Sequence, residues 1–411
     1  MKAVVFTLGC KVNACESASL MNGLKELGYE VTDELSPADL YIVNTCAVTA
    51  EAEKKSRQAI ARARKFNPRC EIVVTGCASQ KSPEDFLKKN NVTLVTGAQS
   101  KDKILSMIGK KGVVLDSDDG YYEEFLPAKT GGTRAYVKVQ DGCDNFCSYC
   151  VIPYLRGRSR SRRPENILKE IEYLSPKEVV ITGINLSAYD KGGEGLTGLV
   201  RRLSSVECRI RLGSLEVNVI DDEFLCALKG LPDFAPHFHL SLQSGSDGVL
   251  KAMNRRYTAE EFLKKCGLIR SYFPDAGITT DIIVGYSAET EEDFLRTLET
   301  ARKARFSDIH CFPYSRREGT VGAKLKELPH EVKEERMSRM LALKAELKDA
   351  FLRERRGKTE DFLAEEEENG FSVGYTGNYL RCYVKGVPVG EKVPVVVGER
   401  YADGAFAEVL K

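Results

Sequence analysis

The sequence has no long apolar segment and almost no net charge. None of its hydrophobic runs reaches the roughly 18 residues that a membrane-spanning helix needs, so we expect no membrane span. The first residues, MKAVVFTLGC, lack the layout of a signal peptide, which favours the cytoplasm. The 61 Lys and Arg residues are matched by 60 Asp and Glu. Whole-chain charge therefore indicates no partner, and a nucleic-acid surface would have to be a local patch.

The sequence also lacks the patterns of a zinc protein and of a disulfide framework. Its four histidines stand in no Cys/His pairing pattern, which argues against structural zinc. Its thirteen cysteines are odd in number, and the chain carries no export signal. Such cysteines favour metal or redox chemistry over disulfide bonds.

Length and patterning predict two or three domains in a globular α/β protein. The chain has 411 residues, of which 42% are hydrophobic and 29% charged. In residues 1–110, short apolar runs alternate with helical stretches, which predicts a parallel sheet built from βαβ units. The predicted strands are 3–6, 40–43, 72–74 and 93–95, and the predicted helices are 16–27, 50–65 and 83–89. No Gly-x-Gly-x-x-Gly motif indicates a dinucleotide site.

A predicted linker, 111–133, precedes a second α/β region over 134–356. Its helical patterns separate six predicted strands, at 135–139, 179–182, 210–212, 238–242, 279–284 and 309–312. Six βα units are too few for an eight-stranded barrel, so we expect an open, partial (β/α)6 barrel with a trailing helix at 331–356.

The last part of the chain, 357–411, is predicted to be a small antiparallel β-barrel. Short strands separated by Gly, Pro and Asn turns are expected at 362–363, 372–375, 380–384 and 393–397. Barrels of this kind often bind nucleic acid. The acidic run 365–368 is expected to be a solvated turn.

Three cysteines in one polar loop, Cys143, Cys147 and Cys150, form a C-x3-C-x2-C motif just after the strand 135–139. A 4Fe–4S cluster takes four thiolates, so three leave one iron without a protein ligand. Structural zinc, the alternative, usually needs a second cysteine or histidine pair, and none follows Cys150. The spacing therefore predicts an iron–sulfur site with an open coordination position.

A second, dispersed trio comprises Cys10, Cys46 and Cys77, each just beyond the carboxyl end of a predicted parallel strand. Ligands of open α/β sheets bind at this edge, so three strands can deliver three thiolates to one point. On spacing alone, the three cysteines could equally be buried core residues that share no metal group. The other seven cysteines are expected to be structural, with Cys15 the exception to watch because it lies close to Cys10.

The chain resembles, nearly from end to end, the methylthiotransferase family of radical S-adenosylmethionine enzymes. The resemblance rests on TLGCKVN (7–13), NTCAVT (44–49), TGCASQ (75–80), GCDNFCSYCVIPYLRGRSRSR (142–162), HLSLQSGSDGVLKAMNRRY (239–257) and TDIIVGY (280–286). The first three are similar to the cluster domain of the family, the fourth to its radical-SAM loop and the last two to barrel motifs. The C-terminal segment resembles a shortened TRAM domain, a small RNA-binding barrel.

The resemblance implies two 4Fe–4S clusters and S-adenosylmethionine as cofactors. Cys143, Cys147 and Cys150 would be the catalytic trio, whose cluster binds and reductively cleaves S-adenosylmethionine. The trio at 10, 46 and 77 would hold an auxiliary cluster that carries the inserted sulfur. One S-adenosylmethionine would methylate that sulfur, and another would yield the radical that abstracts the substrate hydrogen. This fits the general rule that cofactors, and not side chains, carry radical chemistry.

Residues at the strand ends are expected to bind S-adenosylmethionine, although each alone is equally compatible with an ordinary loop or packing role. Tyr149 would flank the adenine, Gly183 would allow close approach to the methionine moiety, and Glu216 would accept from the ribose. The full set is Tyr149, Gly183, Asn185, Glu216, Gln243, Ser244, Ile283 and Gly285. The chain departs from the family at 286–290, which reads YSAET instead of the common FPGET, and at Ala14-Cys15.

The string GCKVN (9–13) is most similar to the subgroup that acts on N6-threonylcarbamoyladenosine next to the tRNA anticodon. The alternatives are isopentenyladenosine in tRNA, a ribosomal-protein aspartate and, from another class, a non-catalytic zinc and RNA-binding protein. Expected RNA contacts are Arg156, Arg158, Arg160, Arg162, Arg163, Tyr379 and Arg381, together with Lys54, Lys55, Arg57, Arg62, Arg64 and Lys65 on one helix. Expected partners are the tRNA anticodon stem-loop and an electron donor such as flavodoxin or ferredoxin, and the chain is expected to be a monomer.

Overall fold

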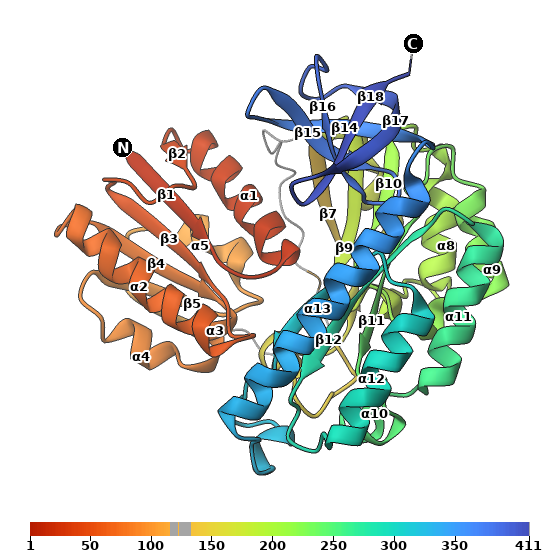
Figure 1. Ribbon diagram of the computed structural model, residues 1–411. Coiled ribbons are helices and arrows are strands. Elements are labelled where there is room, and N and C mark those ends of the chain that lie inside the picture. Colours follow the sequence, from red (N-terminus) through yellow and green to blue (C-terminus); the bar gives the residue numbers. More distant parts are fainter. Residues whose placement is uncertain (116–121, 123–132, 411) are drawn as a thin grey trace. The chain divides into compact units, whose positions relative to one another are not determined.

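The computed structural model describes residues 1–115, 122 and 133–410, which form two compact units (Figure 1). Unit 1 comprises 1–130, 138–163 and 317–323, and unit 2 comprises 131–137, 164–316 and 324–411. Most of the predicted linker, 116–121 and 123–132, lies outside the described residues. Each unit is described below by itself.

Unit 1 contains a six-stranded parallel sheet with the order β2-β1-β3-β4-β5-β6. The strands are β1 (Lys2–Thr7), β2 (Glu30–Thr32), β3 (Leu40–Thr45), β4 (Glu71–Gly76), β5 (Val92–Thr96) and β6 (Gly112–Val114). Runs of Val and Ile form the central strands because both faces of the sheet are buried. The predicted α/β class is therefore confirmed, and sequence analysis missed only the two three-residue strands, β2 and β6.

The helices of unit 1 cover both faces of this sheet. They are α1 (Lys11–Glu26), α2 (Ala50–Phe66), α3 (Cys77–Lys81), α4 (Pro83–Leu87), α5 (Ile104–Met107) and α6 (Ile152–Arg156). Alternate residues of each strand belong to two hydrophobic cores on opposite faces of the sheet. Val4 and Val74 pack with α2, whereas Val5 and Val73 pack with α1. Helix α1 begins five residues earlier than predicted, because polar side chains on its buried face interrupt the apolar repeat.

Unit 2 contains most of the partial barrel. Its strands are β7 (Arg134–Asp141, whose last residues belong to unit 1), β9 (Glu178–Gly183), β10 (Arg209–Leu212), β11 (His237–Gln243), β12 (Gly277–Val284) and β13 (Asp308–Pro313). Two sheets, β10-β9-β7 and β11-β12-β13, are joined where the amide of Leu215 donates to His239 and its carbonyl accepts from Ser241. In unit 1 the end of β7 pairs antiparallel with β8 (Arg160–Ser161). The six predicted barrel strands are all present.

Helices follow the barrel strands as the βα pattern predicts. They are α7 (Pro164–Leu174), α8 (Gly195–Arg202), α9 (Asp222–Lys229), α10 (Asp247–Ala252), α11 (Ala259–Tyr272) and α12 (Glu291–Ala304). Capping boxes start two of them, Thr258 with Glu261 and Thr290 with Asp293, so backbone N–H groups that would otherwise lack partners are satisfied. Along β11, Phe238, Leu240 and Leu242 are fully buried, and the alternate residues of this strand face the interior of the barrel.

The C-terminal segment is a closed five-stranded barrel that follows the long helix α13 (His330–Arg355). Its strands are β14 (Thr359–Glu368), β15 (Phe371–Thr376), β16 (Arg381–Val384), β17 (Lys392–Tyr401) and β18 (Gly404–Val409). The predicted turn at 365–368 is wrong: Glu366, Glu367 and Glu368 continue β14 and pair with β15. Their side chains are exposed, so the acidic run is a solvated strand end.

The C-terminal barrel is anchored at the N-terminal ends of the central strands by a buried acid. Glu178, at the start of β9, accepts from the guanidinium of Arg211 at 2.8 and 3.0 Å and pairs with Arg134 at 2.6 Å. Arg211 also donates to the carbonyls of Thr376 and Gly377 in the C-terminal barrel, at 3.1 and 2.9 Å. Burial would raise the pKa of Glu178, but these arginines hold it below its usual value.

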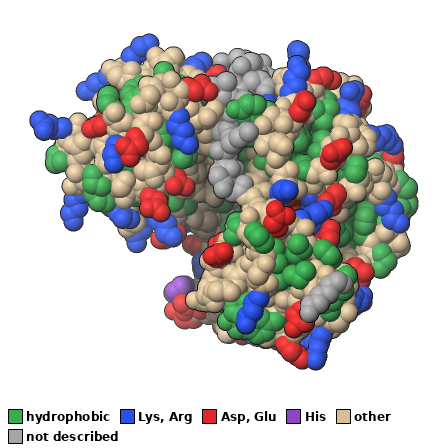
Figure 2. All heavy atoms as spheres, turned by 90° about the horizontal axis from the view of Figure 1, so that it is seen from above, with side chains coloured by type: hydrophobic (Ala, Val, Ile, Leu, Met, Phe, Trp, Pro, Cys, Tyr) green, Lys and Arg blue, Asp and Glu red, His purple; other side chains and the backbone are tan. Residues whose placement is uncertain are grey.

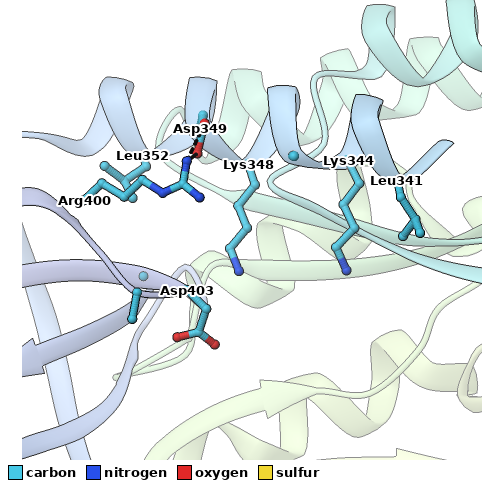
Figure 3. A pocket seen from close by; sticks show the side chains of 10 residues that line it. Leu341, Lys344, Lys348, Asp349, Leu352, Arg400 and Asp403 are labelled. Atoms are coloured by element: carbon cyan, nitrogen blue, oxygen red, sulfur yellow. Dashed lines mark hydrogen bonds and ion pairs between the residues drawn. The ribbon is translucent and has the colours of Figure 1, made fainter. Parts of the chain in front are cut away.

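A cavity of about 320 Å³ lies between α13 and the end of the C-terminal barrel (Figure 3). Lys344 and Lys348 point into it from the helix, and Arg400 is paired with Asp349 at 2.6 Å. Both lysines also pair with Asp308, at 3.2 and 3.9 Å. Its basic groups thus have acidic partners, so we assign the cavity no anion.

We expect Glu178→Ala to lower the free energy of unfolding by about 3–5 kcal/mol, because it removes the buried carboxylate that Arg134, Arg209 and Arg211 share. Glu194→Ala, which removes an exposed partner of Arg202, should change stability far less. Urea unfolding followed by far-UV circular dichroism measures both, since the chain has no tryptophan. Equal losses in the two variants would contradict the anchoring role of Glu178.

Candidate functional site

The dispersed cysteines lie at one edge of the unit 1 sheet. Cys10 is the N-cap residue of α1, just beyond β1, Cys46 directly follows β3, and Cys77 directly follows β4 and begins α3. These three strands are neighbours and run parallel, so their carboxyl ends share an edge. Cys46 and Cys77 are buried, whereas Cys10 is exposed.

Two glycines make this close approach of the cysteines sterically possible. Gly9 has a φ of +107°, and a Cβ there would lie 2.9 Å from both Cβ and Sγ of Cys46. Gly76 has a φ of +102°, and a Cβ there would lie 2.4 Å from the carbonyl oxygen of Thr45. A side chain at either position would displace the strand ends, so both glycines are required by the geometry of the trio.

The thiols are close enough to influence one another electrostatically. Burial, assisted by the charges of Cys77 and Cys10 and opposed by the N–H of Val48 and by Arg156, raises the pKa of Cys46 to about 11. Without a metal group, Cys46 is therefore a neutral thiol at pH 7. Because thiolates are the ligands of iron, binding of a cluster here would release this proton.

The second trio lies in the loop after β7, which also belongs to unit 1. The amide of Cys143 donates to the carbonyl of Gly157 at 3.1 Å, and that of Cys150 donates to Cys147 at 2.9 Å. Gly142 has a φ of +71°, and a Cβ there would lie 1.9 Å from the carbonyl oxygen of Arg158. The loop is therefore held against the chain at 157–158, and none of the chain's cysteines, all of which are described, forms a disulfide.

Between the trios, unit 1 buries a cluster of charged side chains centred on Arg156. Its guanidinium donates to both oxygens of Glu16, at 3.0 and 3.2 Å, and to both oxygens of Asp141, at 3.0 Å each. It also donates to Asn13 at 2.6 Å, and its Nε lies 3.4 Å from Sγ of Cys77. Arg156 is thus in hydrogen-bond contact with one member of the dispersed trio.

The described residues of the cluster include both carboxylates and cations. The carboxylates are Glu16 and Asp141, and the cations are Lys101, Lys138, Arg156 and Arg160. Burial would raise the pKa of both acids, but the cations outweigh burial and lower it. Buried charges need partners of opposite sign. The guanidinium of Arg156, which lies beside Cys77, would offset the negative charge of cluster thiolates, so these residues fit an anionic iron–sulfur group.

Sequence analysis missed this charged cluster. Its signal was Asn13, Glu16 and Ser17 at helical spacing on the buried face of α1, where a soluble helix normally carries apolar residues. The cations come from positions far away in the chain, so their convergence could not be read from spacing.

Burial reduces the predicted RNA surface around the cysteine loop. Of the five arginines at 156–163, Arg156, Arg160 and Arg162 are buried. Only Arg158 and Arg163 are exposed, and Arg158 pairs with Asp144 at 3.0 Å. The guanidinium groups exposed to solvent here are thus those of Arg158 and Arg163, and RNA contact by the five arginines stays a prediction.

Helix α2 exposes its predicted basic residues. Lys54, Lys55, Arg57, Arg62 and Lys65 are exposed and Arg64 is half-buried. A cleft of about 670 Å³ is lined by Gln58, Ala61, Arg62, Arg64, Lys65, Pro68 and Asn91. Blue basic side chains follow the outer rim of the N-terminal unit in Figure 2.

The predicted RNA pair in the C-terminal barrel is engaged within unit 2. Tyr379 stacks on His237 at 4.4 Å and on Tyr375 at 4.5 Å between ring centroids. Arg381 pairs with Glu366, Glu368 and Asp403 at 2.8–3.5 Å. Tyr379 therefore helps to attach the C-terminal barrel, and Arg381 lies in an acidic environment.

Tyr149, the residue expected to flank the adenine, is half-buried in the cysteine loop of unit 1, and the other predicted cofactor residues follow the barrel strands of unit 2. Glu216 pairs with Arg255 at 3.0 Å, and Gln243 has a φ of +66°. Ser244 is fully buried, with its hydroxyl 3.2 Å from that of Thr297 on α12. Gly183 and Ile283 are half-buried, and Asn185 is nearly buried.

Gly285 directly precedes the departure at 286–290 and is held by Glu289, which the family sequence shares. It has a φ of +75°, and a Cβ there would lie 2.5 Å from Cγ of Lys333. Its amide donates to Oε2 of Glu289 at 2.9 Å, and the same oxygen accepts from Arg336 at 2.8 Å. Burial raises the pKa of Glu289 to about 7, although the Gly285 amide and Arg336 act in the opposite direction.

Comparison with known proteins gives consistent matches. The uncharacterized protein family UPF0004 matches residues 2–97, and the Radical SAM superfamily matches 137–301. The threonylcarbamoyladenosine tRNA methylthiotransferase MtaB of Bacillus subtilis (strain 168) is 38% identical over 441 residues, which cover 100% of this chain and 98% of that protein. The tRNA-2-methylthio-N(6)-dimethylallyladenosine synthase of Thermoanaerobacter sp. (strain X514) is 36% identical and covers 87% of this chain and 81% of its own length.

A solved structure supports the fold. The radical S-adenosylmethionine methyltransferase TsrM from Kitasatospora setae, with cobalamin and a 4Fe–4S cluster bound, covers 78% of this chain and 77% of its own. The TM-score is 0.57 at 14% identity, so the likeness shows the fold alone. Among the helices of the described residues, none has the length and apolar character needed to cross a membrane.

We expect Arg156→Met to destabilise the protein by about 3–5 kcal/mol, because it leaves Glu16 and Asp141 buried with less compensation. Arg163→Met is the matched control, since Arg163 is exposed, and should change stability by about 0.5 kcal/mol or less. Urea unfolding of the metal-free proteins measures both. Similar stability of the two variants would show that Arg156 is not the centre of the buried cluster.

The raised pKa of Glu289 predicts a pH dependence of stability. The folded protein keeps this proton up to about pH 7, whereas the unfolded chain releases it near pH 4.3. The stabilisation is therefore complete below about pH 4.3 and is lost as the pH rises to 7. Between pH 5 and 8 the unaltered protein should lose roughly 2–3 kcal/mol of unfolding free energy through Glu289. Glu289→Gln has no such proton to release, so its unfolding free energy should not show this loss. Identical pH profiles would refute this assignment.

Proposed function

Because the chain belongs to the methylthiotransferase family of radical S-adenosylmethionine enzymes, we propose that it adds a methylthio group to C2 of N6-threonylcarbamoyladenosine next to the tRNA anticodon. The observation that carries the proposal is a full-length relative named for this activity, together with two cysteine trios within one unit. The family consists of sulfur-group transferases, and tRNA is the substrate that the names of the relatives indicate.

Two 4Fe–4S clusters fit the residues that are present. Cys143, Cys147 and Cys150 would hold one cluster in the loop after β7, and Cys10, Cys46 and Cys77 would hold the auxiliary cluster at the sheet edge. When bound, these groups supply reductive cleavage of S-adenosylmethionine and a sulfur to be transferred. The chain contributes the thiolates and buried cations that would offset their negative charge. Gly9 and Gly76 contribute the space that lets the strand ends approach one another.

Binding of S-adenosylmethionine is proposed for residues that follow the barrel strands. Support comes from their position at the carboxyl ends of parallel strands, where barrel enzymes bind ligands. Within unit 2 we propose Gly183, Asn185, Glu216, Gln243, Ser244, Ile283 and Gly285 for this role. Tyr149 is proposed separately, from its place in the cysteine loop of unit 1.

We propose the exposed face of α2 and the exposed arginines Arg158 and Arg163 as the RNA-contacting surface of unit 1. The support is local charge, since phosphate contacts need clustered Lys and Arg side chains. A tRNA substrate would place the enzyme in the cytoplasm, and reduction of the cluster would need a one-electron donor such as flavodoxin or ferredoxin. The monomeric state stays a prediction of the sequence.

Cluster loading and product formation separate the roles of the two trios. The anaerobically reconstituted protein should hold about eight irons per chain, and Cys46→Ala or Cys147→Ala about four. Cys147→Ala should lose cleavage of S-adenosylmethionine, whereas Cys46→Ala should keep cleavage and lose methylthiolation. Cys226→Ala, an exposed cysteine outside both trios, should keep both. Methylthiolation that survives in Cys46→Ala would refute the auxiliary role.

Nucleoside mass spectrometry of tRNA decides the substrate. tRNA from a strain without the gene should lack 2-methylthio-N6-threonylcarbamoyladenosine, and the purified enzyme should restore it. Loss of the 2-methylthio form of dimethylallyladenosine would favour the other tRNA substrate, which the 36% identical relative makes a specific alternative. Unchanged tRNA would overturn the tRNA assignment and favour a ribosomal-protein aspartate.

A further inference from the structure

Three of the four histidines of the chain lie on strands β11–β13 of the partial barrel, separate from the six cysteines of unit 1. His237 and His239 belong to β11, and His310 belongs to β13. Asp281, on the intervening strand β12, is paired in register with His310. The strand register thus places two imidazoles and a carboxylate side by side, although they are far apart in sequence.

The nitrogen and oxygen atoms of these side chains converge. One ligand atom from each of His239, Asp281 and His310 lies within 4.8 Å of the other two. Nε2 of His239 is 3.2 Å from Oδ2 of Asp281, and Nδ1 of His310 is 3.3 Å from Oδ1. The two rings lie 5.2 Å apart between centroids.

These separations are slightly longer than typical hydrogen bonds and are compatible with a shared metal ion. N–H···O bonds are most often about 2.9–3.0 Å long. In a tetrahedral site with metal–ligand bonds of about 2.0–2.1 Å, neighbouring ligand atoms are about 3.3 Å apart. Two histidines and one carboxylate are also a recurrent donor set for zinc and for non-haem iron.

The surroundings orient one imidazole as a metal ligand. Nδ1 of His239 is 2.8 Å from the hydroxyl of Thr279, and Nε2 of His237 lies 2.8 Å from the same hydroxyl. The tautomer that donates from Nδ1 to Thr279 would leave the lone pair of Nε2 available to a metal ion. Metal-binding histidines usually have such a partner on the second nitrogen.

Solvent can reach the cluster. The side chains of His239, Asp281 and His310 are 11%, 26% and 48% exposed. An ion held by three such ligands keeps at least one coordination position open.

We propose that His239, Asp281 and His310 form a binding site for a divalent transition-metal ion of the zinc or iron(II) class, with an open position for an oxygen ligand. The site is independent of the six cysteines and of the proposed tRNA substrate.

Zinc is the probe, because elemental analysis counts it separately from the iron of the clusters. The cluster-loaded protein is incubated anaerobically with Zn²⁺, dialysed, and analysed for zinc and iron. We expect one zinc per chain in the unaltered protein and less than a fifth of that in His310→Ala and in Asp281→Asn, with iron unchanged. His330→Ala is the matched control, since His330 is exposed on α13 and should leave zinc binding intact.

A second measurement identifies the donor atoms. Co²⁺ bound to the same protein should give a high-spin electron paramagnetic resonance signal that is lost in His310→Ala and kept in His330→Ala. Oxidised 4Fe–4S clusters are silent in this measurement, so they do not obscure it. Zinc or cobalt retained equally in His310→Ala and Asp281→Asn would overturn the proposal, as would their absence from the unaltered protein. Neither outcome bears on methylthiolation, because no tRNA or S-adenosylmethionine is used.

Discussion

The guanidinium of Arg156 is the group on which the interior of unit 1 depends. It comes from the end of the cysteine loop segment, yet it fills a fully buried position among Asn13, Glu16 and Asp141. A planar guanidinium offers five N–H donors in a fixed fork, whereas a lysine ammonium offers three. This one side chain therefore links the N-terminal sheet to the loop of the second cysteine trio.

The contact between Arg156 and Cys77 gives that link a chemical consequence. Reduction potentials of iron–sulfur groups depend on nearby charge and on hydrogen bonds to sulfur. The guanidinium beside Cys77 places positive charge at the sheet edge, which favours an anionic group there. The cations that stabilise the fold would thus also stabilise the thiolates of the proposed auxiliary cluster.

Unit 2 also contains a buried group of charged side chains that joins distant segments of the chain. Glu178 is surrounded by Arg134, Arg209 and Arg211, and Arg211 continues to the backbone of the C-terminal barrel. Stacking of Tyr379 on His237 completes the attachment. Tyr379, which the sequence suggests as an RNA contact, therefore also helps to attach the C-terminal barrel. RNA contact by Tyr379 and Arg381 stays a prediction.

The sequence alone determined the fold class, the positions of the barrel strands and the location of both cysteine trios, because these follow from local periodicity and from short motifs. It could not determine which charged residues are buried. The arginines at 156, 160 and 162 look like a surface patch in the sequence, but all three are buried in the structure. Tertiary contacts hold two of them inside: Arg156 pairs with Glu16 and Asp141, and Arg160 pairs with Asp141. The convergence of His239, Asp281 and His310 was equally hidden, since strand register brings together side chains from three separate strands. Pairings between distant segments depend on packing of the whole chain, and local sequence carries no record of them.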